Sequence, residues 1–202
     1  MRVTYQSIAN LTLVLAISLL AGCGTQVKRV GVEEVHDLSG AWNDTDSQLV
    51  AKEMINDMME RNWRNDFANQ KQRRPAVIVG TIRNLSHEHI SVNTFINDIE
   101  REVINSGRVI FVASKDERSE IREERKDQDL HAREATRKAM GQETGADFML
   151  KGSINTIIDV DGKTQLRYYQ VDLNLISLAN NHIVWVGSKK IKKLVENSKL
   201  RY

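Results

Sequence analysis

The strongest constraint on the fold is the alternation of apolar and polar residues in the C-terminal third of the chain. In the stretch DFMLKGSINTIIDV, one face of an extended strand carries apolar or small residues: Phe148, Leu150, Gly152, Ile154, Thr156, Ile158 and Val160. Asp161-Gly162 is a strong hairpin signal, and the return strand alternates in the same way. A second turn at Asn180-Asn181 precedes a third strand. The sequence therefore predicts a three-stranded antiparallel meander.

Helices and strands alternate before this meander. The first predicted helix opens with Asp44, Thr45 and Asp46 as candidate N-caps, because short polar side chains accept hydrogen bonds from the first turn. The predicted elements are a helix at 43–67, a central strand at 76–84, a helix at 91–107 that ends at Gly107 and a short strand at 108–113. We therefore predict an α/β fold class: a single domain with a mixed sheet flanked by helices, ending in the meander.

The segment between residues 114 and 145 is dense in charge. Its composition favours helix, which predicts two surface helices with a weak point in KDQDLHA, residues 126–132. The residues expected to face inward are Ile121, Leu130, Ala135, Ala139 and Met140.

The single cysteine of the chain follows a short apolar run. Residues 8–20 are too few to span a bilayer, which needs about 20 apolar residues, and they suit the apolar core of a secretory signal. Leu20, Ala21, Gly22 and Cys23 resemble the lipobox of bacterial lipoproteins, which implies acylation of the Cys23 thiol and cleavage before it. The alternatives are an ordinary signal peptide with an incidental cysteine, or an uncleaved anchor. The residue after the cysteine is Gly24 and not the Asp that often retains lipoproteins in the inner membrane. This favours a location at the outer membrane, on its periplasmic side.

The predicted mature chain has nearly balanced charge. Of 29 Lys and Arg residues only Arg2 lies in the signal, which leaves 28 against 27 Asp and Glu, and this balance gives no indication of nucleic-acid binding. With one cysteine, no intrachain disulfide forms. The predicted organisation is a lipoprotein signal peptide at 1–22, a lipidated N-terminus and flexible tether at 23–43, a globular domain at 44–196 and a basic tail at 197–202. The tether of about twenty residues spans at most ~70 Å.

No pattern in the sequence indicates catalysis, a cofactor or a metal. Gly-x-Ser-x-Gly and Ser-x-x-Lys motifs are missing, and no Gly-rich phosphate loop follows a strand. His87 and His89 form a His-x-His without a third ligand at a diagnostic spacing, so we interpret them as part of a polar loop. The paired aspartates are interpreted as a helix cap, a helix boundary and a turn: Asp44 and Asp46, Asp127 and Asp129, Asp159 and Asp161.

Basic residues gather at the C-terminus. Lys189, Lys190, Lys192 and Lys193 precede Lys199 and Arg201. This set either binds anionic lipid head groups or a protein partner, or it is a solvated strand edge on which lysines prevent aggregation.

Four stretches resemble a known family, the LpoB-type (YcfM-like) outer-membrane lipoproteins. They are RPAVIVGTIRNLSHEHI, FINDIEREVINSGRVIFV, GADFMLKGSINTII and RYYQVDLNLISLANNHIVW, and with their intervals they cover roughly residues 46–192. The resemblance implies a compact α/β domain without enzymatic activity that binds a class A penicillin-binding protein in the periplasm and stimulates peptidoglycan synthesis. It assigns no partner-binding residue.

One feature departs from the family. Members that reach an inner-membrane synthase through the wall have a long, often proline-rich tether, whereas the tether predicted here is short and lacks proline. The alternative hypothesis is a structural or secretion-associated outer-membrane lipoprotein, similar to the curli-secretion lipoprotein. An enzyme with carboxylates dispersed in the sequence is a third.

Overall fold

The computed structural model describes residues 26–31 and 34–196. The chain divides at Val35 into two units, and every helix and strand described below belongs to the unit that begins there. The predicted signal peptide, the lipobox with Cys23 and the tail at 197–202 lie outside the described residues. Within the described part of the chain, no helix has the length and apolar character needed to cross a membrane.

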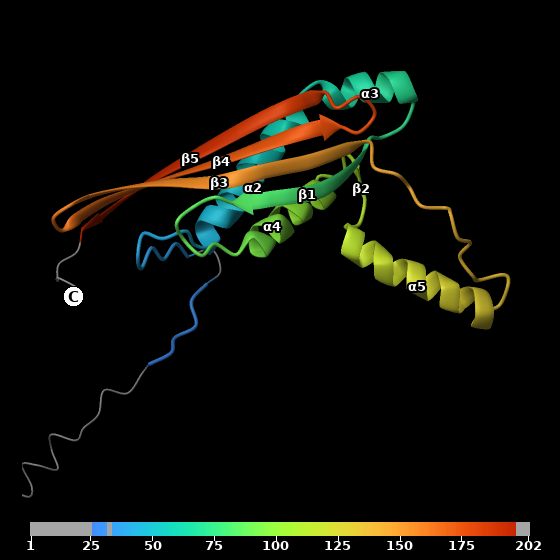
Figure 1. Cartoon of the computed structure of the whole chain (residues 1–202), viewed down its shortest axis with the longest axis horizontal. Helices are drawn as coiled ribbons and strands as arrows, with labels where there is room; N and C mark the ends of the chain where they lie inside the picture. Colours follow the sequence, from blue (N-terminus) through green and yellow to red (C-terminus); the bar gives the residue numbers. More distant parts are fainter. Residues whose placement is uncertain (1–25, 32–33, 197–202) are drawn as a thin grey trace, which may run out of the picture. The chain divides into compact units, whose positions relative to one another are not determined.

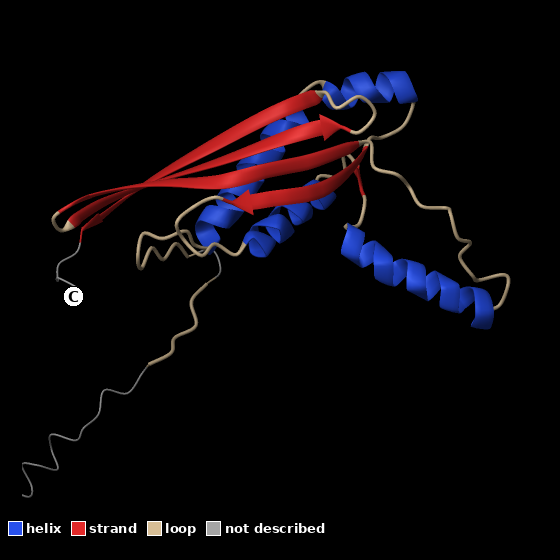
Figure 2. Ribbon diagram, in the orientation of Figure 1, coloured by secondary structure: helices blue, strands red, loops and turns tan. Residues whose placement is uncertain are grey.

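The sheet has five strands in the order β2-β1-β3-β4-β5 (Figures 1 and 2). Its strands are β1 at Ala76–Asn84, β2 at Ile110–Phe111, β3 at Phe148–Asp161, β4 at Thr164–Ser177 and β5 at Ile183–Glu196. β1 pairs parallel to β2 and β3, and the last three strands pair antiparallel. Gly162 and Asn181 have positive φ angles in the two connecting turns. The predicted mixed sheet and meander are therefore confirmed.

Two helices cover one face of the sheet. The helices are α2 at Asp44–Glu60, α3 at Trp63–Lys71, α4 at Val92–Asn105 and α5 at Lys115–His131. The two helices that cover the sheet are α2 and α4. Their buried side chains, such as Met58 and Phe95, form one core with residues on the facing side of the meander, such as Leu173. Val160, predicted on that same buried face, is 59% exposed, because the meander continues past the end of β1 at Asn84 (Figure 1).

The first predicted helix is two helices, and its predicted cap is wrong by one residue. Asn43 is the N-cap of α2; its side chain accepts from the Asp46 N–H while the Asp46 carboxylate accepts from the Asn43 N–H. α2 ends at Arg61, which is extended. The indole N–H of Trp63 then donates to the carbonyl of Met58 at 2.7 Å, which buries Trp63 at the start of α3.

The charged segment forms one helix, not two. α5 buries none of its residues, and the predicted second helix is replaced by turns and irregular chain. All five residues expected to face inward are exposed: Ile121, Leu130, Ala135, Ala139 and Met140. The returning chain is held by Glu143, which accepts from Arg122 and Arg125 at 2.8–2.9 Å. Helical propensity without an apolar face to bury is too weak to fix a second helix.

Candidate functional site

The segment before α2 contributes to the core of the domain. We name residues 35–43 the strap. Trp42 packs edge-on against Phe95 and Tyr169, with ring centroids 5.9 and 5.7 Å apart. Gly40 has a φ of +66°, and a Cβ atom there would overlap the side chain of Val195. The strap therefore lies tightly against the end of the sheet where β5 finishes.

One carboxylate fastens the strap to the sheet. Glu88 lies 2.8 and 2.9 Å from the Tyr169 hydroxyl, accepts from Arg167 at 2.9 Å and accepts from the Trp42 N–H at 3.2 Å. Burial and the neighbouring Glu88 raise the pKa of Tyr169 well above its usual value, so this hydroxyl stays a donor. Glu88 thus joins the loop after β1, strand β4 and the strap.

A second ionic contact holds the same region. The Lys193 ammonium donates to Asp37 and to Asp46, each at 2.6 Å, and to the carbonyl of Ala41 at 3.3 Å. Burial lowers the pKa of Lys193, but the two carboxylates outweigh that effect, so the pKa lies above its ordinary value. The strap is consequently bound to β5 at Lys193 as well as to β4 at Tyr169.

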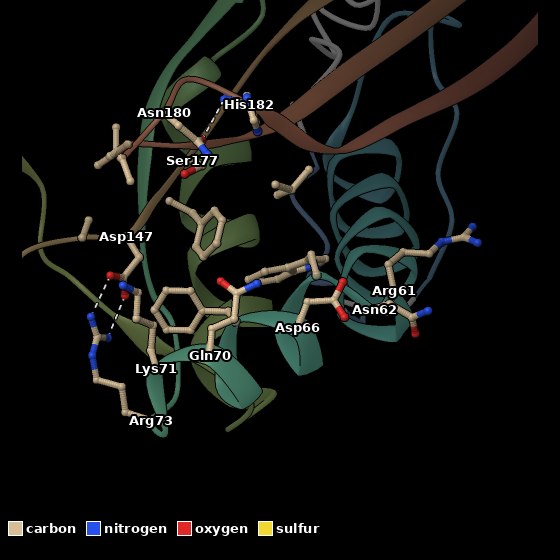
Figure 3. A pocket seen from close by; sticks show the side chains of 17 residues that line it. Arg61, Asn62, Asp66, Gln70, Lys71, Arg73, Asp147, Ser177, Asn180 and His182 are labelled. Carbon is tan, nitrogen blue, oxygen red and sulfur yellow. Dashed lines mark hydrogen bonds and ion pairs between the residues drawn. The ribbon is translucent and has the colours of Figure 1, made fainter.

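A cleft of about 960 Å³ lies at the opposite end of the meander, between α3 and the turn that joins β4 to β5 (Figure 3). Its apolar lining comes from α3, the turn and the adjoining ends of β3 and β5: Trp63, Phe67, Phe148, Leu178 and Val184. The Phe148 ring packs edge-on against Trp63 and Phe67, with centroids 5.1 and 5.5 Å apart. This aromatic cluster positions α3 over the sheet.

Polar side chains surround the mouth of the cleft. Asp66 and Gln70 lie on α3, and Asn180 and His182 lie across from them on the turn (Figure 3). Among the residues that the structure describes, the side chains of Asp66 and Gln70 form no hydrogen bond or ion pair. An apolar floor with a few polar groups at its rim is the usual form of a binding site.

An ion pair closes one side of the cleft. Arg73 donates to both oxygens of Asp147 at 2.8 and 2.7 Å, and the Ala76 N–H donates to the same carboxylate at 2.8 Å. Burial raises the pKa of Asp147, but the bonds from Arg73 and Ala76 outweigh it and bring the pKa below its usual value. Asp147 therefore stabilises the junction of α3, β1 and β3 in its ionised form.

We expect Asp147→Asn to weaken the dependence of stability on pH. The depressed pKa contributes stability that is complete above the unfolded pKa of about 4 and is lost as the pH falls through the folded value. Urea unfolding should give a higher free energy of unfolding for the wild type than for the variant at pH 7. This difference should shrink below pH ~4. A difference that stays constant down to pH 2 would contradict this role.

His87 and His89 lie in a polar loop, as interpreted from the sequence, but the sequence does not single out the residue between them. His87 and His89 are exposed, and the residue between them, Glu88, points inward to Tyr169 and Arg167. Across residues 26–31 and 34–196, no three His, Cys, Asp or Glu residues are grouped as a metal site would require. No local signal marks Glu88, because its partners are about 80 residues away in the sequence.

The three aspartate pairs lie at or near the ends of elements, although Asn43, and neither Asp44 nor Asp46, is the N-cap of α2, and Asp159 lies within β3. Asp46 completes the cap of α2, Asp127 and Asp129 lie in the last turns of α5, and Asp161 ends β3 at the hairpin. Leu20, Ala21, Gly22 and Cys23 lie outside the described residues, so the structure does not bear on the lipidation site.

The sequence of this domain matches a family model. The family model described as peptidoglycan-synthase activator LpoB matches residues 46–191, from the first turn of α2 into β5. The chain belongs to the LpoB family. The LpoB match includes α5 and begins after the strap. A search among curated proteins finds no match.

Solved LpoB domains are similar to this chain. The LpoB C-terminal domain from Escherichia coli is 12% identical, with a TM-score of 0.45, over 73% of this chain and 99% of that one. The Salmonella enterica domain is 11% identical, with a TM-score of 0.42 over the same shares. Lipoprotein GNA1162 from Neisseria meningitidis is 16% identical, with a TM-score of 0.37, over 62% of this chain and 87% of that one.

Proposed function

We propose that this protein is an outer-membrane lipoprotein, anchored through Cys23 on the periplasmic side, that binds a class A penicillin-binding protein and stimulates peptidoglycan synthesis. The observation that carries the proposal is the LpoB family match over residues 46–191. The lipobox Leu20, Ala21, Gly22 and Cys23 supplies the anchor. Growth with labelled palmitate tests the anchor. The wild-type protein should incorporate label, and the Cys23→Ser variant should not. Unlabelled wild-type protein would contradict the anchor.

The protein acts without catalysis in this proposal. Binding would favour the active conformation of the synthase, and the gain in activity cannot exceed the difference in affinity for its two states. Affinity capture with each class A synthase of the same cell tests the binding directly. One synthase should bind, and binding to none of them would contradict the proposal.

The short tether restricts where the partner is met. Because the compact unit begins at Val35, only residues 24–34 separate it from Cys23. Eleven residues span at most about 40 Å when fully extended. The proposed partner therefore has to reach close to the outer membrane.

We propose that the arm, residues 115–144, forms part of the partner surface. α5 has no buried residue and is dense in both charges, so its conformation does not depend on burial against the sheet. Charged residues at the rim of an interface govern the association rate and the choice of partner more than they govern the affinity of the complex.

Charge reversal on the arm should weaken binding without unfolding the domain. Glu120 and Glu123 are exposed, so we expect Glu120→Lys with Glu123→Lys to reduce synthase affinity about tenfold, measured by surface plasmon resonance. The control is Glu60→Lys at the exposed end of α2, which should leave affinity unchanged. Unchanged affinity in the arm variant would remove the arm from the interface.

A further inference from the structure

The outer end of the meander carries apolar side chains on the face away from the helices. Tyr169 is buried under the helices, and because side chains alternate along a strand, Leu166 and Tyr168 point to the opposite face. In the strand register Leu166 lies opposite Leu194, and Tyr168 lies opposite Ile157. We name these four residues the meander patch.

The meander patch is exposed and continuous across three strands. Ile157 is 64% exposed and Leu194 63% exposed, and Leu166 and Tyr168 are half-buried between them. The strands extend here beyond β1 and beyond the two core helices (Figures 1 and 2). A contiguous apolar patch on a protruding surface indicates an interaction site.

Basic side chains border the patch. Lys192 lies opposite Tyr168 in the register, and Lys190 is on the same face two residues earlier. Both are exposed, and within the described residues neither forms an ion pair. Asp159 lies on the same face directly opposite Leu166, and Asp161 and Glu196 follow at the hairpin end, so the basic character is confined to Lys190 and Lys192 on the other side of the patch. Tyrosine, aliphatic and lysine side chains together are typical of surfaces that meet a bilayer interface.

The strap fixes which end of the domain lies toward the anchor. Asp37 is bound to Lys193 and Gly40 lies against Val195, so the chain enters the domain beside the last residues of β5. These residues are at the same end of the meander as the patch. With Cys23 acylated and residues 24–34 as the only spacer, this end of the domain is held within about 40 Å of the membrane.

We propose that the meander patch docks the domain onto the phospholipid surface, with Ile157, Leu166, Tyr168 and Leu194 entering the interface and Lys190 and Lys192 contacting anionic head groups. Docking turns a loosely held domain into an oriented one. The geometry uses the proposed acylation of Cys23, but the surface itself does not depend on synthase activation.

Vesicle flotation of residues 24–202, without acyl chains, tests this surface. All core residues lie between 42 and 191, so this segment retains the whole fold. Binding should be several-fold stronger to vesicles of phosphatidylethanolamine with phosphatidylglycerol than to vesicles of phosphatidylcholine alone. Ile157→Ser with Leu194→Ser should reduce the bound fraction at least fivefold.

The control is Val186→Ser. Val186 is 64% exposed on the same face of β5, but at the other end of the strand, so its loss should leave vesicle binding unchanged. As a second readout, Tyr168→Trp emission should shift to the blue when vesicles are added. No binding by the wild type, or an equal loss in the Val186 variant, would overturn the proposal.

A second copy of the chain is the competing occupant of the patch. Sedimentation would then show a dimer that the Ile157 and Leu194 substitutions dissociate, without vesicle binding, and this outcome would also overturn the proposal. The same double variant should still activate the synthase in solution. Failure of membrane docking and failure of the proposed function are therefore distinguishable.

Discussion

Replacing Glu88 with alanine should lower the free energy of unfolding by about 3 kcal/mol, because it removes the carboxylate that a half-buried guanidinium and a buried hydroxyl share. Arg167 and Glu88 are only 19% and 16% exposed in their side chains, so solvent compensates little for the loss. The Tyr169 hydroxyl would retain one contact, to the Gly40 carbonyl at 3.2 Å. Urea unfolding at pH 7 measures the effect.

The control for Glu88 is its neighbour. His87→Ala removes an exposed side chain and should change stability by less than about 0.5 kcal/mol. A double-mutant cycle with Tyr169→Phe should give a coupling energy of about 1 kcal/mol or more, because the two groups are in direct contact. Independent effects of the two substitutions would show that Glu88 stabilises the domain in some other way.

Removing the strap should destabilise the domain by about 4 kcal/mol. A chain that begins at residue 44 loses the packing of Trp42 on Phe95 and Tyr169, the Asn43 cap and one carboxylate of the Lys193 pair. Thermal and urea unfolding of residues 35–202 and 44–202 provide the comparison. Trp42→Ala in the longer chain should account for about 3 kcal/mol of the difference.

The matched comparison for the strap is a longer chain. Residues 24–202 and 35–202 should be equally stable, because the compact unit begins at Val35. If the chain starting at residue 44 were as stable as the chain starting at 35, the strap contacts would contribute nothing to folding.

The parts of the fold that the sequence predicts well are those with local periodicity. The meander follows from alternation and from Gly162 and Asn181, whose backbone conformations mark the turns. α4 follows from its apolar stripe and from Gly107, which has a φ of +62° just after the helix. In these elements the residues that form the structure are neighbours in the sequence.

The parts that escape prediction depend on distant contacts. Nothing near Trp42 indicates that it meets Tyr169, so residues 35–43 read as a tether although they pack on the domain. The second surface helix fails for the opposite reason: local propensity favours it, but no apolar face anchors it to the sheet. The cleft beside α3 also needs the break at Arg61, which a continuous apolar pattern from residue 43 to 67 conceals.

The central claim is that this member of the LpoB family activates a peptidoglycan synthase. The most direct measurement adds residues 24–202 to each class A penicillin-binding protein of the same cell and follows polymerisation of lipid-linked precursor. We predict a several-fold increase in rate with one synthase and no change with the others. No increase with any synthase, from a folded domain, would contradict the claim and would assign the fold another task close to the outer membrane.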